Sequence, residues 1–162
     1  MPTLTRQLDH EEAESHVAKL CGKEVSRTWL GYAAALFLEF GELRPSETSG
    51  NLRGEATIML DTAWRHGIGG IELTDRNDDD SDIEQHLEAL ADCVIEAITI
   101  YRHDFSLELE ITGGRWIRSP GCRWDQSPSW SIFLGDGRWI KVADGTLCIE
   151  RGVESLDTGE TV

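Results

Sequence analysis

Regular alternation of apolar and polar side chains in the last third of the chain is the feature that most constrains the fold. Over residues 105–111, aliphatic side chains alternate with Glu108 and Glu110, so an extended strand there has one apolar and one charged face. Two segments, ITGGRWIR at 111–118 and LGDGRWIK at 134–141, each place a glycine-containing turn before a Trp-bearing stretch. This third of the chain therefore predicts antiparallel strands joined by tight turns.

Strand-forming residues also fill the segments 23–43 and 54–65, and the polar segment 44–53 between them is typical of a loop. A parallel α/β fold needs a helix between successive strands, and the sequence shows no such alternation. We therefore expect the α+β class: a curved antiparallel β-sheet or partial barrel with one main helix and a short N-terminal helix.

Both helices are predicted from apolar residues at helical spacing. The main helix is expected over 82–92, where Ser81 and Glu84 have the spacing of a capping box. The short helix is expected over 10–20, preceded by Asp9 as its cap.

The chain has 162 residues, the size of one domain. We expect residues 1–21 to form a helical extension, 22–151 a single α+β domain and 152–162 a flexible tail. No signal peptide or membrane span is evident, and the four cysteines are far apart without a CxxC pair. These features favour a cytoplasmic location.

Charge restricts the classes of partner. The chain carries 30 Asp and Glu against 15 Lys and Arg, a formal net charge of −15. Binding to nucleic acid or to an anionic membrane requires a basic face, so neither is expected. A hydrophobic content of 40% with six tryptophans indicates a folded protein rather than a disordered acidic chain.

Motifs for catalysis or metal binding are lacking. There is no GxSxG, no phosphate-binding glycine loop and no HExxH. The aspartate-rich segment 75–82 resembles a calcium loop in composition. Counting from Asp75, however, Asp80 and His86 occupy the positions where an EF-hand loop needs glycine and glutamate. We therefore expect no enzyme, no cofactor and no bound metal.

One alternative is a small-ligand-binding or hydrolytic site in a concavity of the sheet. Glu39, Glu55, Trp64 and Arg65 lie on adjoining predicted strands, and paired carboxyl groups at a controlled separation can perform acid–base chemistry. Ordinary ion pairing between strands explains the same residues.

The segments 22–43, GKEVSRTWLGYAAALFLEFGEL, and 51–65, NLRGEATIMLDTAWR, together resemble a group of small bacterial proteins of uncharacterised function. The order of strands and turns in the C-terminal third is similar to that of small domains that act as immunity proteins against bacterial toxins. The chain departs from the group at 61–64, where Asp-Thr-Ala-Trp replaces the usual Glu-Trp-Ser-Trp. The resemblance implies a protein that binds another protein.

Together, charge and resemblance predict a non-catalytic, immunity- or inhibitor-like module that occludes a basic partner such as a toxin. An anionic scaffold accelerates the encounter with a cationic protein. Two alternatives remain open: acidity that only confers solubility, and a homodimer formed through an exposed strand edge or the Trp-containing hairpins. The expected partner-binding residues are Asp75, Asp78, Asp79, Asp80, Asp82, Glu84, Glu88, Glu108 and Glu110.

Overall fold

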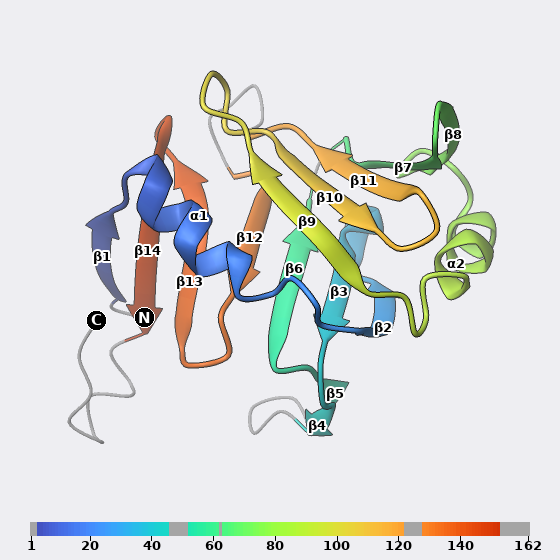
Figure 1. Ribbon diagram of the computed structural model, residues 1–162, viewed down its shortest axis with the longest axis horizontal. Helices are drawn as coiled ribbons and strands as arrows, with labels where there is room; N and C mark the ends of the chain where they lie inside the picture. The colour runs from blue at the N-terminus through green and yellow to red at the C-terminus, as the bar shows by residue number, and fades with distance from the viewer. Residues whose placement is uncertain (1–2, 46–51, 62, 122–127, 153–162) are drawn as a thin grey trace.

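The computed structural model describes residues 3–45, 52–61, 63–121 and 128–152, and these form two antiparallel sheets and two helices (Figure 1). The seven-stranded sheet has, in spatial order, β1 (Thr3–Gln7), β14 (Thr146–Gly152), β13 (Arg138–Ala143), β12 (Trp130–Phe133), β6 (Ala56–Leu60), β3 (Leu36–Phe40) and β2 (Val25–Leu30). The five-stranded sheet has β8 (Ile71–Asp75), β7 (Arg65–Ile68), β11 (Arg115–Ser119), β10 (Leu107–Ile111) and β9 (Ile95–Ile100).

The remaining elements are the helices α1 (His10–Ala18) and α2 (Asp80–Glu88), a 3-10 turn (Tyr32–Ala34) and the two-stranded ribbon of β4 (Arg44–Pro45) and β5 (Leu52–Arg53). The α+β class expected from the sequence is confirmed. Within the described residues, neither sheet closes into a barrel.

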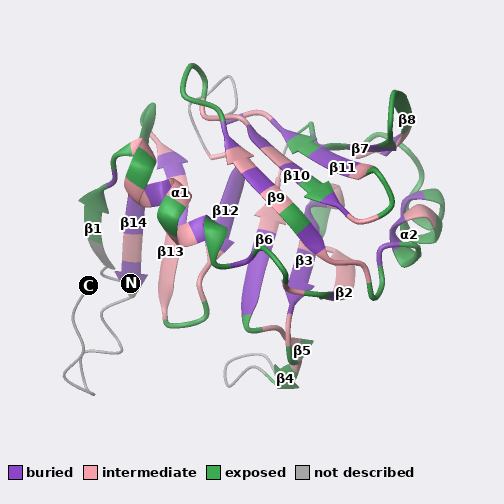
Figure 2. Ribbon diagram, viewed as in Figure 1, coloured by how far each residue is buried: buried purple, intermediate pink, exposed green. Residues whose placement is uncertain are grey.

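One continuous core holds the layers together. The five-stranded sheet and α1 lie on the same side of the seven-stranded sheet, as Figure 1 shows. The aliphatic side chains of β10 are buried, as their alternation predicts, and belong to the same cluster as Leu36, Leu38 and Phe40 of β3. In Figure 2, purple covers most of β6 and β12, whereas purple alternates with pink and green along β9, β10 and β11.

The N-terminal segment is an integral part of this fold. β1, which the sequence analysis did not predict, pairs along its length with β14, and Ala13 and Val17 of α1 enter the core. The expected tail beyond residue 152 lies outside the described part of the chain.

Both helices are shorter than predicted, and only one has the predicted cap. Asp9 and Glu12 form a reciprocal capping box on α1. In α2 the predicted box of Ser81 and Glu84 is wrong, because the helix begins at Asp80 and Ser81 already lies inside it. Its N-cap residue, Asp79, makes no side-chain capping bond.

The structure contains an internal repeat that relates segment 9–30 to segment 79–100. Each segment has a nine-residue helix, a turn and a six-residue strand, in α1–β2 and α2–β9 respectively. The two strands meet at an isolated bridge between Glu24 and Val94, which are equivalent positions. The four flanking backbone bonds are Gly22 N to Ile95 O, Asp92 N to Val25 O, Val25 N to Cys93 O and Ile95 N to Lys23 O. A shift of 70 residues exchanges these bonds in pairs, so an approximate two-fold axis passes through the bridge.

Two buried tryptophans extend the repeat. Trp64 donates its indole N–H to the carbonyl oxygen of Ala34 at 2.9 Å, and Trp130 donates to that of Phe105 at 2.9 Å. Ala34 and Phe105 occupy equivalent loops and both have positive φ, 61° and 57°. Each indole therefore fixes a strained loop of its own half.

Candidate functional site

The densest group of acidic residues lies at one end of the molecule, on α2 and on the turn that precedes it (Figure 1). Between Glu72 and Glu96 the sequence has ten acidic residues and one Lys or Arg, Arg76. Asp78, Asp79, Asp80, Asp82, Glu84 and Glu88 are exposed, and Asp75 is half-buried. We call these seven residues the acidic surface.

Hydrogen bonds order the turn at the start of this surface. Asp78 accepts from Thr74 Oγ1 at 2.6 Å and from the backbone N–H of Asp75 at 3.1 Å, while Asp75 accepts from the N–H of Asn77 at 2.8 Å. The bond from Thr74, followed by that from Asp75, lowers the pKa of Asp78. The carboxylate of Asp78 is therefore held in its charged form.

Repulsion between acidic groups extends beyond α2. Glu24 lies at the two-fold axis, and its interaction with the carboxyl group of Asp92, in the turn after α2, raises the pKa of Glu24. Two carboxyl groups this close disfavour double ionisation.

The repeat allows α2 to be compared with an equivalent helix in the same molecule. On α1, Glu11 pairs with Arg102 at 2.5 Å and Glu12 with Arg6 at 3.0 Å. Glu14 lies 3.3 Å from His10, which is an ion pair only when the histidine is protonated. On α2, Asp80, Asp82, Glu84 and Glu88 form no ion pair with any described residue. The same scaffold thus pairs two acidic side chains of α1 with arginines and leaves Asp80, Asp82, Glu84 and Glu88 of α2 without an ion pair among the described residues.

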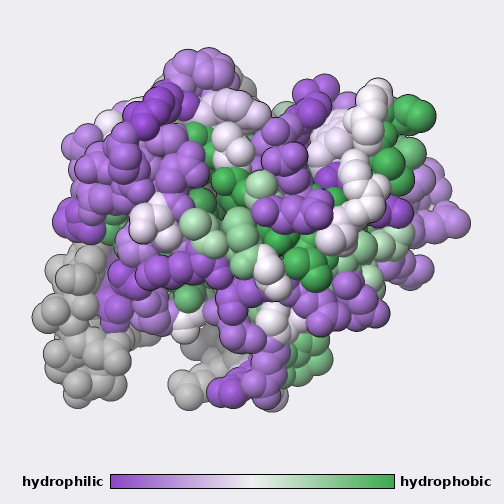
Figure 3. Space-filling view, in the orientation of Figure 1, coloured by the Kyte–Doolittle hydropathy of each residue, from purple (hydrophilic) through white to green (hydrophobic). Residues whose placement is uncertain are grey.

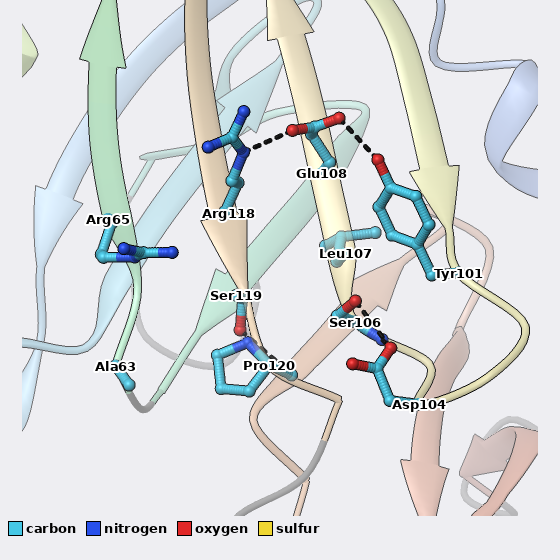
Figure 4. A pocket seen from close by; sticks show the side chains of 10 residues that line it. All are labelled: Ala63, Arg65, Tyr101, Asp104, Ser106, Leu107, Glu108, Arg118, Ser119 and Pro120. Carbon is cyan, nitrogen blue, oxygen red and sulfur yellow. Dashed lines mark hydrogen bonds and ion pairs between the residues drawn. The ribbon is translucent and has the colours of Figure 1, made fainter. Parts of the chain in front are cut away.

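Glu108 and Glu110 lie apart from the acidic surface, on the outer face of the five-stranded sheet. Glu108 accepts from Tyr101 Oη at 2.8 Å and pairs with Arg118 (Figure 4). Burial raises the pKa of Glu108, but the bonds from Arg118 and Tyr101 outweigh this effect and leave the pKa low. Glu108 is therefore a neutralised anion, whereas Glu110 is exposed.

Figure 4 shows the open pocket beside this pair, of about 560 Å³. Its polar side chains satisfy one another or nearby groups: Asp104 accepts from the N–H and hydroxyl of Ser106, at 2.9 and 2.7 Å, and Arg65 pairs with Glu72 at 3.3 Å. None of the described residues that line the pocket has a buried polar atom without a partner, so the geometry of these residues does not indicate a ligand.

The alternative site of Glu39, Glu55, Trp64 and Arg65 is not assembled. Trp64 is buried between the sheets, while Arg65 is exposed on the five-stranded sheet. Consecutive residues of an extended chain point to opposite faces. Glu55 is exposed and pairs with Lys23 at 3.2 Å. These three side chains therefore do not line a common concavity with Glu39.

Glu39 has a structural environment that the sequence did not reveal. It is fully buried on β3 and accepts hydrogen bonds from Trp29 Nε1 at 2.9 Å, from the backbone N–H of Gly54 at 3.0 Å and from Thr57 Oγ1. With these donors its carboxyl oxygens are occupied within the fold.

The sequence analysis also missed two exposed isoleucines, Ile68 and Ile71, in the β7–β8 hairpin next to α2. The sequence signal for them is the Gly69–Gly70 turn that they flank. Among the described residues, no group of three or more His, Cys, Asp or Glu side chains could hold a metal ion. No helix in the described part of the chain is long and apolar enough to span a membrane.

Comparison with known proteins gives no relative: no family model, no curated protein and no solved structure matches this chain.

Proposed function

We propose that this protein is a non-catalytic binding module, immunity- or inhibitor-like, whose acidic surface occludes a basic protein such as a bacterial toxin. The observation that carries this proposal is the unpaired charge of α2, set against the paired charge of its equivalent, α1.

The acidic residues of α2 are not explained by a contribution to the stability of the helix. Asp80 and Asp82 lie in the first turn, where the helix dipole favours anions, but Glu88 lies at the opposite end, where an anion is unfavourable. Asp80, Glu84 and Glu88 are also spaced four residues apart, and like charges at this spacing repel. A cationic partner relieves this repulsion, which supports binding over solubility as the role of the surface.

The net charge of the chain also indicates which kind of partner it attracts. A second copy of this chain carries the same charge of −15 and is repelled at long range, whereas a basic protein is attracted. In this proposal the encounter takes place in the cytoplasm and is accelerated by electrostatic steering.

The test first identifies a partner and then measures its kinetics. A photo-reactive amino acid at position 84, introduced in cells of the source organism, cross-links the partner, which is then purified. Association rates are measured against ionic strength for the natural protein and for a double variant, Glu84→Gln with Glu88→Gln. The matched control, Glu11→Gln with Glu14→Gln, removes the same charge from α1.

We expect the α2 variant to associate at least about threefold more slowly at low salt and to show a weaker salt dependence. The α1 control should retain the natural rate. Equal rates for both variants, or association that does not depend on salt, would contradict the proposal. Failure to cross-link a basic protein at position 84 would contradict it too.

A further inference from the structure

The end of the molecule that carries the acidic surface also carries an exposed apolar pair. Ile68 and Ile71 are 36% and 68% exposed, and the register of the β7–β8 hairpin places them opposite each other. Figure 3 shows hydrophobic residues at this end, over β8, with hydrophilic residues beside them. Since β8 is the last strand of its sheet and contacts α2, the hairpin that carries the pair lies at the sheet edge beside the acidic helix.

The hairpin that carries the pair is held rigidly. Trp116 donates its indole N–H to the carbonyl oxygen of Gly69 at 2.7 Å, and the N–H of Gly69 donates to Gly114 O at 3.0 Å. The Trp116 ring also packs on Gly67 so closely that a Cβ there would lie 2.3 Å from its Cζ2 atom. Two turns are thereby fixed to each other, so the isoleucines are ordered before any partner arrives and binding needs less ordering.

We infer that Ile68 and Ile71 form the apolar centre of the partner-binding surface, with the acidic residues of α2 as its charged rim. This inference rests on the proposed function and adds the chemistry of the partner: a basic protein that presents apolar side chains at the point of contact. Charge complementarity selects this occupant: Arg115 is the register partner of Ile68 and Arg65 pairs with Glu72, but the acidic residues of α2 beside the hairpin form no ion pair with a described residue. An apolar centre within a polar rim is the common anatomy of protein interfaces.

The test uses the full chain and two defined probes, octalysine and a peptide with the same number of lysines and interspersed leucines. Chemical-shift mapping locates each peptide, and calorimetry measures its affinity for the natural protein, for Ile71→Ser and for Leu52→Ser. Leu52 is the matched control, because it is 44% exposed on β5, away from α2 in Figure 1.

Both peptides should shift the amide signals of α2, and only the leucine peptide should shift those of residues 68–71. We expect it to bind about tenfold more tightly than octalysine. Ile71→Ser should remove most of this advantage and leave octalysine binding unchanged, while Leu52→Ser should change neither.

Three results would overturn the inference: equal affinity of the two peptides, an advantage that survives Ile71→Ser, or an equal loss with Leu52→Ser. If octalysine still maps to α2 in any of these cases, the proposed function stands without the apolar centre. A leucine peptide that shifts residues 68–71 while octalysine shifts nothing would support the apolar centre and contradict the acidic rim.

Discussion

Acid sensitivity is expected from a single buried histidine. His66 on β7 is fully buried, and its register partners are Ile117 on β11 and Thr74 on β8. Neither ring nitrogen has a hydrogen-bond partner among the described residues. Burial, together with the nearby Arg115 and His86, lowers the pKa of His66 from 6.5 to about 4. The folded protein therefore holds this imidazole in its neutral form at pH 7.

The sign and size of the effect follow from this difference. Because the folded pKa lies below the unfolded pKa, protons favour the unfolded chain. The contribution of His66 to stability is complete above about pH 6.5 and falls as the pH drops toward 4. The whole loss amounts to ~3.4 kcal/mol, and ~2 kcal/mol of it is reached at about pH 5.

Urea unfolding between about pH 7.5 and about pH 5 measures this contribution. We expect the natural protein to lose ~2 kcal/mol more than His66→Leu over this range, because leucine does not titrate. The control His103→Gln, which replaces an exposed histidine, should lose as much as the natural protein. Parallel stability curves for the natural protein and His66→Leu, or an NMR-measured pKa of His66 above 6, would refute the reasoning.

Three further perturbations test the fold. Asp9→Ala should reduce the free energy of unfolding by ~1 kcal/mol, because it removes the capping box, while Asp79→Ala, at the equivalent cap without a side-chain bond, should change it by only a few tenths; urea unfolding compares the two. Glu39→Gln should reduce it by ~2 kcal/mol, since an amide cannot accept all three bonds at its two ends, and an unchanged urea midpoint would contradict this role. Gly67→Ala should destabilise by about 1–3 kcal/mol in thermal unfolding, because the new Cβ meets the backbone oxygen of Ile71 at 2.4 Å, whereas Gly70→Ala has open space and should be nearly neutral.

The sequence predicted correctly those features of the fold that depend on residues close together in the chain. The alternation in 107–111 gives β10 its buried face, and the Asp9–Glu12 spacing gives α1 its cap. β1 was missed because its sequence, TLTRQ, is short and mostly polar. This segment forms a strand because it pairs with β14 along its whole length.

Grouping of the candidate site residues was harder to predict. Trp64 and Arg65 were placed in one concavity with Glu39 and Glu55 because all four lie on adjoining predicted strands, but Trp64 is buried between the sheets and Arg65 is exposed. The internal repeat was also hidden, since few side chains are shared between 9–30 and 79–100. It became visible only through equivalent backbone bonds around Glu24 and Val94.

By itself the sequence determined the sign and amount of charge, the antiparallel strands and the position of an acidic helix, because periodicity and composition are local properties. The tertiary structure alone decided which acidic residues stay charged without a partner. Glu11 is neutralised by Arg102, which is 91 residues away in the chain, whereas the acidic residues of α2 form no ion pair with a described Lys or Arg. Ion pairs depend on distance in space, and folding sets that distance.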